Sequence, residues 1–124
     1  METNERNSVS LLMPENMGRM NDPDGSAFID GICGDSMEMY LIIENNIITE
    51  SKFFTNGCNS SRFCGSAAAR LAKGKSIKDV LRLSPADVID TGGEIPDREV
   101  HCAILAVSTL HKSLADYLLK VQNG

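Results

Sequence analysis

The sequence has no tryptophan, few other aromatic residues and no run of basic residues. Twelve Lys and Arg residues stand against seventeen Asp and Glu residues, which gives a net charge of -5. Phosphate binding needs clustered lysine or arginine, so this composition argues against nucleic acid as the main partner. No apolar run approaches the roughly 18 residues of a membrane span, so we expect no membrane-spanning segment.

We also expect no secretory signal, because the sequence opens with a polar stretch over its first seven residues. We therefore expect a cytoplasmic protein, in which thiols stay reduced. Its four cysteines are better interpreted as metal-binding or reactive groups than as two disulfides, although an isolated free cysteine more often only packs in a core. None of them forms the C-x-x-C pair that is typical of structural zinc sites.

The length of 124 residues is enough for one domain whose core needs no disulfide. Residues 1–20 are predicted to be a mobile N-terminal segment, because no amphipathic period is sustained there. Residues 21–124 then form the single domain.

The first half of this domain has the pattern of an antiparallel sheet. Strands are predicted over residues 27–32, 37–43 and 47–55, because apolar residues alternate in the second and turn residues separate all three. Asn45 and Asn46 tolerate positive φ and supply the tight hairpin between the last two strands. The first and third strands of such a meander run in the same direction, so the chain leaves both at one end of the sheet.

The second half is predicted to be helical. One helix begins at Ser60 or Ser61 and ends before Gly74, and two short helices begin at the serine caps Ser76 and Ser84.

A long amphipathic helix is predicted from His101 onward. Its apolar stripe recurs every three or four residues and consists of Ile104, Val107, Leu110, Leu114, Tyr117 or Leu118, and Val121. The predicted fold class is therefore α+β, with a three-stranded antiparallel sheet packed against helices.

Three cysteines lie at predicted element boundaries: Cys33, Cys58 and Cys102. Cys102 follows His101 at a helix start, where unpaired N–H groups and the positive end of the helix dipole favour a thiolate. Asp35 lies two residues after Cys33. Three thiols, a carboxylate and an imidazole are the donors of a metal site. Because these donors are far apart in sequence, folding must assemble the site between elements, which suits delivery of metal or sulfur better than permanent binding.

Five short motifs occur in order along the chain: residues 14–18 (PENMG), 33–35 (CGD), 57–58 (GC), 73–76 (KGKS) and 101–106 (HCAILA). Together they resemble the signature of the IscU/NifU-type iron–sulfur cluster assembly scaffolds, over residues 14–121. The resemblance implies the IscU/NifU-like fold, also called SufE/NifU. It further implies an assembly scaffold without its own turnover rather than an enzyme.

The same resemblance implies the site residues. Cys33, Cys58 and Cys102 would be thiolate ligands of a transient 2Fe-2S cluster, and Asp35 or His101 would supply the fourth ligand. Cys102 is the implied acceptor of persulfide sulfur. A carboxylate is a harder ligand than a thiolate, so Asp35 is expected to make the cluster labile.

Several partners are implied as well. They are a cysteine desulfurase, an electron donor such as ferredoxin and apo iron–sulfur recipient proteins. The sequence leaves two forms open for the holo protein, a monomer and a homodimer that shelters the cluster between chains. Iron is the metal expected in the assembled cluster, and zinc binds readily to the same thiolates in the apo form.

Two features depart from the family pattern. Residues 95–99 (IPDRE) replace a segment with a basic end that a specialised Hsp70 chaperone binds in relatives, so we do not expect that chaperone as a partner. Cys64 is an additional thiol. In a regular helix it lies about 9 Å along the axis from Cys58, too far to share one small cluster, so we expect it to be packed in the core.

The main alternative is a zinc-dependent sulfur-transfer protein, in which Cys33, Asp35, Cys58 and Cys102 hold zinc and one thiol accepts sulfur. Relatives of that kind carry an insertion between the second and third cysteines. The interval from Cys58 to Cys102 has no such insertion, which favours the scaffold. A small zinc-stabilised interaction module is a third interpretation, and it predicts unfolding when metal is chelated.

Overall fold

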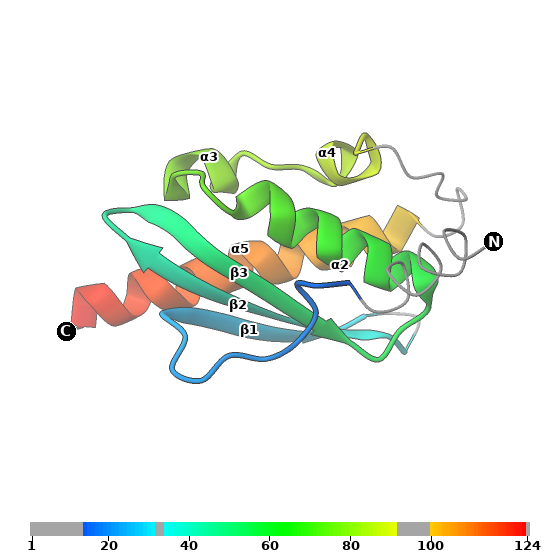
Figure 1. Cartoon of the computed structure of the whole chain (residues 1–124), viewed down its shortest axis with the longest axis horizontal. Helices are drawn as coiled ribbons and strands as arrows, with labels where there is room; N and C mark the ends of the chain where they lie inside the picture. The colour runs from blue at the N-terminus through cyan, green and yellow to red at the C-terminus, as the bar shows by residue number, and fades with distance from the viewer. Residues whose placement is uncertain (1–13, 32–33, 92–99, 124) are drawn as a thin grey trace.

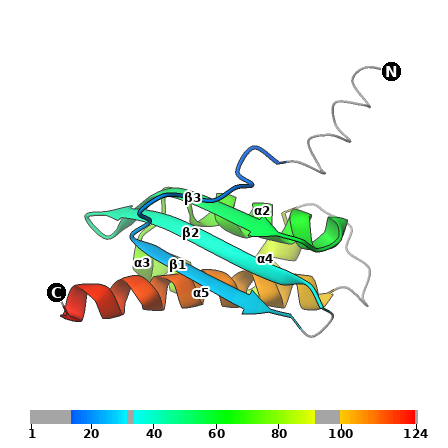
Figure 2. The same cartoon turned by 90° about the horizontal axis from the view of Figure 1, so that it is seen from below.

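A computed structural model describes residues 14–31, 34–91 and 100–123 of the chain. The described elements are β1 (Gly25–Asp30), β2 (Ser36–Glu44), β3 (Ile47–Thr55), α2 (Asn59–Ala72), α3 (Ile77–Leu81), α4 (Pro85–Ile89) and α5 (Val100–Asn123). α5 packs on β1 and β2, α2 packs on β3, and the two helices contact each other on the same face of the sheet (Figures 1 and 2). The predicted α+β architecture is confirmed.

The sheet is antiparallel with the strand order β1-β2-β3, as predicted. Asn45 and Asn46 have φ values of 54° and 64° and form the hairpin between β2 and β3. β1 starts two residues earlier than expected, because Gly25 still pairs with Leu41 of β2. In β2 every second side chain is buried beneath the helices, which is the predicted alternation.

The chain just before the sheet lies along the outer edge of β3. The backbone N–H of Phe53 donates to Asn16 and its carbonyl accepts from Gly18, at 3.1 and 2.7 Å. The Asn16 side chain exchanges two further hydrogen bonds with Ser66 of α2, at 3.0 and 2.9 Å. This pairing places Asn16 and Gly18 on the strand edge, and the mobility expected for residues 1–20 stays a prediction from the sequence. Residues 1–13 lie outside the described part of the chain.

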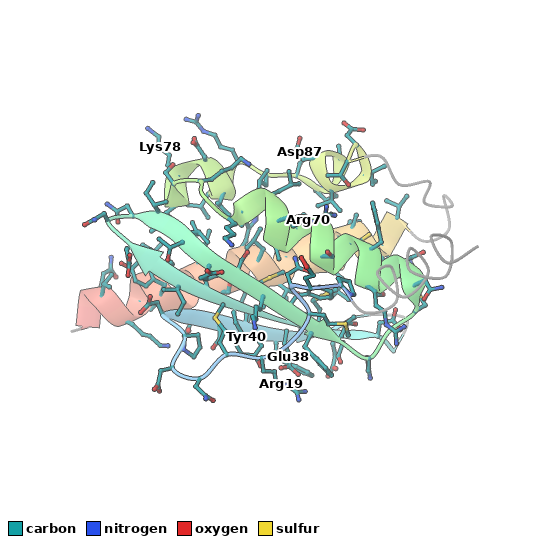
Figure 3. All side chains as sticks on the ribbon, viewed as in Figure 1. Arg19, Glu38, Tyr40, Arg70, Lys78 and Asp87 are labelled. Atoms are coloured by element: carbon teal, nitrogen blue, oxygen red, sulfur yellow. The ribbon has the colours of Figure 1, made fainter. Side chains whose placement is uncertain are left out.

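The sheet face away from the helices carries a polar network that holds the same segment. Arg19 donates to both carboxylate oxygens of Glu38, at 2.9 and 3.0 Å, and its guanidinium lies 4.1 Å from the centroid of the Phe54 ring. The Tyr40 hydroxyl donates to Glu38 as well (Figure 3). The hydrogen bonds from Arg19 hold the pKa of Glu38 below its usual range.

The short helices start as predicted, whereas α2 does not. The Ser76 hydroxyl accepts from the backbone of Asp79 at 3.1 Å, and the Asp87 carboxylate accepts from the backbone of Ser84 at 2.8 Å. In α2 the cap is Cys58, in an extended backbone conformation, so the expected start at Ser60 or Ser61 is wrong.

The predicted apolar stripe of α5 is confirmed in its middle, where Val107, Leu110 and Leu114 are buried. At its two ends it is wrong, because Ile104 and Val121 are 50% and 53% exposed. Ile104 is exposed because it lies about 100° around the helix from the buried Ala103. Val121 is exposed because the last turns of α5 project past β1 (Figure 1). None of the described helices has the length and apolar character that a membrane crossing requires.

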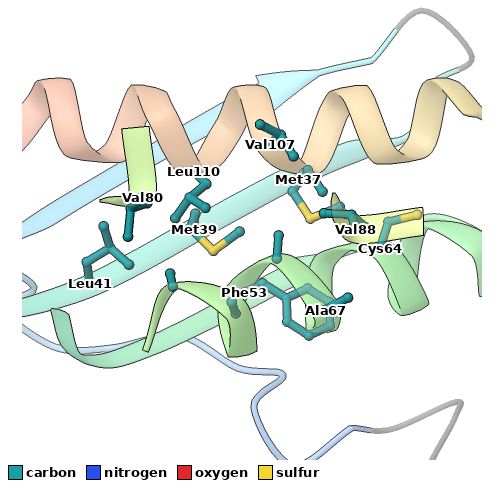
Figure 4. Packing of buried hydrophobic residues seen from close by; sticks show 14 of the residues in the cluster. Met37, Met39, Leu41, Phe53, Cys64, Ala67, Val80, Val88, Val107 and Leu110 are labelled. Carbon is teal, nitrogen blue, oxygen red and sulfur yellow. The ribbon is translucent and has the colours of Figure 1, made fainter. Parts of the chain in front are cut away.

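The core lies between the sheet and the two long helices (Figure 4). Phe53 is fully buried near Met37, and both side chains lie against Gly65 of α2. A Cβ at Gly65 would lie 2.5 Å from the Phe53 ring and 2.9 Å from the Met37 sulfur. The missing side chain is what lets α2 approach β3 this closely.

Gly65→Ala is accordingly expected to lower the free energy of unfolding by about 1 kcal/mol, measured by urea denaturation. Alanine is favoured over glycine inside a helix by about 1 kcal/mol, but crowding of a packed core costs about 1–3 kcal/mol. An increase in stability would mean that helix propensity outweighs the contact, and that the core yields more easily than this packing indicates.

Candidate metal centre

Three predicted donors meet at one end of the sheet. Asp35 lies in the connection between β1 and β2, Cys58 follows β3, and Cys102 is the third residue of α5. Asp30 pairs with Ser36, and Thr55 pairs with the adjacent residue of β2, so both connections leave the sheet at the same end. One ligand atom from each of Asp35, Cys58 and Cys102 lies within 4.8 Å of the others. Two sulfurs and one carboxylate oxygen at this separation can hold a metal ion.

The carboxylate of Asp35 is held from the first turn of α2. The Ser61 hydroxyl donates to Asp35 Oδ2 at 2.6 Å, and Cys58 Sγ lies 3.9 Å from the same oxygen. A Cβ at Gly57 would lie 2.7 Å from both Cγ and Oδ2 of Asp35, so only glycine leaves room for the carboxylate here. α2 has no acidic residue in its own first turn, and Asp35 brings a negative charge close to the start of that helix.

The two described thiols of the centre differ in exposure. Cys58 is exposed, whereas Cys102 is fully buried. Burial raises the pKa of the Cys102 thiol, and the hydrogen bond from Ser61 at 3.4 Å acts in the opposite direction. Burial of the sulfur thus acts against the thiolate that the start of α5 was expected to favour.

His101 directly precedes Cys102 in α5. Its Nε2 atom is 3.7 Å from Cys102 Sγ. The group of mutually close ligand atoms found among the described residues contains Asp35 and not His101. The carboxylate thus lies within 4.8 Å of both thiol sulfurs, and the imidazole lies close to the sulfur of Cys102.

Cys33 and Cys64 are not among the described donors of the centre. Cys33 lies outside the described residues, so its role as a ligand stays a prediction from the sequence. Cys64 is fully buried in the core on α2, which confirms the expected packing role.

Ser61 is the member of the centre that sequence reasoning missed. It was considered only as a helix cap, yet it is fully buried and contacts Asp35, Cys58 and Cys102 at 2.6, 3.9 and 3.4 Å. Its spacing of three residues from Cys58 is a usable signal, because side chains three apart on a helix lie on the same face.

Comparison with known proteins gives a consistent set of similarities. The family model described as the NifU-like N terminal domain matches residues 9–123. The iron–sulfur cluster assembly scaffold protein IscU 1 of Archaeoglobus fulgidus is 34% identical over 108 residues, which cover 86% of this chain and 71% of that protein. The scaffold protein IscU of Aquifex aeolicus is 34% identical over 122 residues, which cover 96% and 78%.

A solved structure shows the same fold. The crystal structure of a nitrogen-fixing NifU-like protein (N-terminal) from Brucella abortus superposes with a TM-score of 0.68 and covers 95% of both chains at 17% identity.

Proposed function

Because this chain belongs to the NifU-like N-terminal domain family, we propose that it is a scaffold on which a transient 2Fe-2S cluster is assembled and from which the cluster is passed to apo-proteins. The observation that carries the proposal is the meeting of Asp35, Cys58 and Cys102, whose ligand atoms lie within 4.8 Å of one another at one end of the sheet. The similarity to proteins named as assembly scaffolds supports the same function.

The cluster is the cargo of the site and needs four ligands from the protein. We assign three of them to Cys33, Cys58 and Cys102, because thiolates are the usual ligands of iron in such clusters. The fourth is Asp35, since its carboxylate oxygen lies within 4.8 Å of both described thiol sulfurs, and His101 is the substitute. A carboxylate binds cluster iron less firmly than a thiolate does, so the bond to Asp35 is the point at which the cluster is released.

Sulfur reaches the site through a persulfide on a cysteine desulfurase. The Cys102 thiolate attacks the outer sulfur, the S–S bond of the desulfurase persulfide breaks, and the desulfurase cysteine leaves as a thiolate. Two electrons from a donor such as ferredoxin then reduce each transferred sulfur to sulfide. Because Cys102 is fully buried, the step requires the site to open toward the desulfurase.

The chain acts without catalytic turnover of its own, receives sulfur from the desulfurase and delivers the cluster to apo iron–sulfur proteins without the specialised Hsp70. A homodimer is the form proposed to shelter the cluster between chains. A cytoplasmic location stays a prediction from the sequence.

The test is anaerobic reconstitution with ferrous iron, cysteine, a cysteine desulfurase and a reductant, followed by iron and acid-labile sulfide analysis. We expect equal amounts of iron and sulfide per chain and a visible cluster spectrum. If zinc remains bound, no cluster forms and desulfurase turnover nevertheless rises, the zinc-dependent sulfur-transfer function replaces the scaffold.

A further inference from the structure

Ser61 lies at the centre of the metal site although it is not one of its proposed ligands. It is the third residue of α2 and is fully buried. Its hydroxyl oxygen is 2.6 Å from Asp35 Oδ2, 3.4 Å from Cys102 Sγ and 3.9 Å from Cys58 Sγ. A serine that only filled space in a core would not place its one polar atom among three donors of a metal site.

The hydroxyl has a single proton, so it donates to one acceptor at a time. The distance of 2.6 Å to Asp35 is typical of a strong, charge-assisted bond between a hydroxyl and a carboxylate, whereas a bond at 3.4 Å to the Cys102 sulfur is weaker. Asp35 is therefore the preferred acceptor.

Asp35 needs such a partner to stay in place. It lies in the connection between β1 and β2, next to Gly34, which has a φ of 86°. The carboxylate is bounded on one side by Gly57, where a Cβ would lie 2.8 Å from Ser61 Oγ as well as 2.7 Å from Asp35 Oδ2. The two side chains thus share one small space, with the thiol of Cys58 3.9 Å from the same carboxylate oxygen.

We propose that Ser61 is a positioning residue that sets the metal affinity of this centre by holding the Asp35 carboxylate toward the thiols. The inference rests on the proposed function in that it takes Asp35 as a metal ligand. Partners that orient a ligating side chain typically change metal affinity by about 10- to 100-fold when they are removed. Ser61 acts through Asp35 and does not itself bind the metal.

The test is a double-mutant cycle with Co²⁺ as the probe, under anaerobic and reducing conditions, on the full chain. Ser61→Ala is expected to weaken Co²⁺ binding about tenfold when Asp35 is present. In the Asp35→Ala background the same substitution should change the affinity less than about twofold, because no carboxylate remains to be positioned. The thiolate-to-cobalt absorption band should persist in every variant, since the cysteines are unchanged.

Ser66→Ala is the matched control, because Ser66 is a second buried serine on α2 whose hydroxyl bonds to Asn16 away from the centre. It should bind Co²⁺ as the unmodified chain does. Thermal unfolding of the apo forms shows whether each variant is folded at the temperature of the titration. An unchanged affinity in Ser61→Ala, or an equal loss with and without Asp35, overturns the positioning role and leaves Ser61 a packing residue.

The cobalt cycle needs no desulfurase, so the two proposals fail separately. If Ser61→Ala weakens Co²⁺ binding only when Asp35 is present, and the chain assembles no cluster, the role of Ser61 is supported and the scaffold function is rejected. If the chain assembles a cluster but Ser61→Ala does not change Co²⁺ affinity, only the role of Ser61 is rejected.

Discussion

Replacing Cys102 with alanine is expected to abolish transfer of sulfur to the chain and to leave no stable cluster after reconstitution. Cys102 is the proposed acceptor of the persulfide sulfur, and its sulfur lies within 4.8 Å of the ligand atoms of both Asp35 and Cys58. The measurement is intact mass after incubation with a cysteine desulfurase and cysteine, in which the unmodified chain gains the mass of one sulfur atom. Iron and sulfide analysis of the same samples follows.

Two matched variants make this result specific. Cys58→Ala should lose the cluster but keep the gain of one sulfur atom, because Cys102 remains. Cys64→Ala, which removes a buried thiol of the core, should keep both the sulfur and the cluster. A Cys102→Ala chain that still accepts sulfur, beside a Cys58→Ala chain that does not, would assign the acceptor role to the exposed Cys58.

Replacing Asp35 with alanine should slow the loss of an assembled cluster about tenfold rather than prevent assembly. The carboxylate is the hardest donor at the site and therefore the weakest bond to cluster iron. Without it, the imidazole of His101, whose Nε2 lies 3.7 Å from Cys102 Sγ, can take the fourth position. The decay of visible absorption after addition of an iron chelator under anaerobic conditions measures the rate.

The double variant that lacks both Asp35 and His101 provides the control. It should lose its cluster faster than the Asp35→Ala chain, because neither donor remains. If Asp35→Ala alone assembles no cluster, Asp35 is an essential ligand and its role in release is wrong. Co²⁺ binds carboxylate oxygen as well as thiolate sulfur, so a loss of Co²⁺ affinity without the Asp35 carboxylate is compatible with slower loss of the cluster in Asp35→Ala.

Several features that depend on neighbours in sequence were predicted correctly, although the start of α2 was not. The hairpin at Asn45 and Asn46 follows from their tolerance of positive φ, which both adopt. The cap at Ser76 uses the backbone N–H of Asp79, and the cap at Ser84 uses the side chain of Asp87, each three residues away. Both helices start where expected. The alternation in β2 requires only that one face of the sheet is covered.

Features that depend on contacts between distant segments were not predictable in the same way. The pairing of Asn16 with Phe53 joins segments 37 positions apart, so the segment before the sheet gave no periodic signal. Ile104 belongs to an apolar stripe by spacing, yet it is half exposed. The side of α5 that faces the core at this end is decided by packing against distant segments, and the spacing alone does not show it.

The candidate site shows the same division. The residue types and their places at element ends indicated the donors Asp35, Cys58 and Cys102, and the direction of the strands explained why the first two meet. The burial of Cys102 and the contacts of Ser61 arise only when α2 and α5 pack side by side. The helix dipole near Cys102 could be inferred from sequence, whereas the burial that raises the pKa of its thiol could not.

In the proposed function, the chain holds the cluster only until it transfers the cluster to an apo-protein. The most direct measurement follows the reconstituted chain after it is mixed anaerobically with an apo-ferredoxin and then separated from it, with iron and sulfide determined on both proteins over time. We predict that the ferredoxin gains as much iron and sulfide as the chain loses, that an iron chelator in solution does not intercept the transfer, and that Asp35→Ala slows it. A chain that keeps its cluster in the presence of the apo-protein, or whose iron passes entirely to the chelator, would contradict the account.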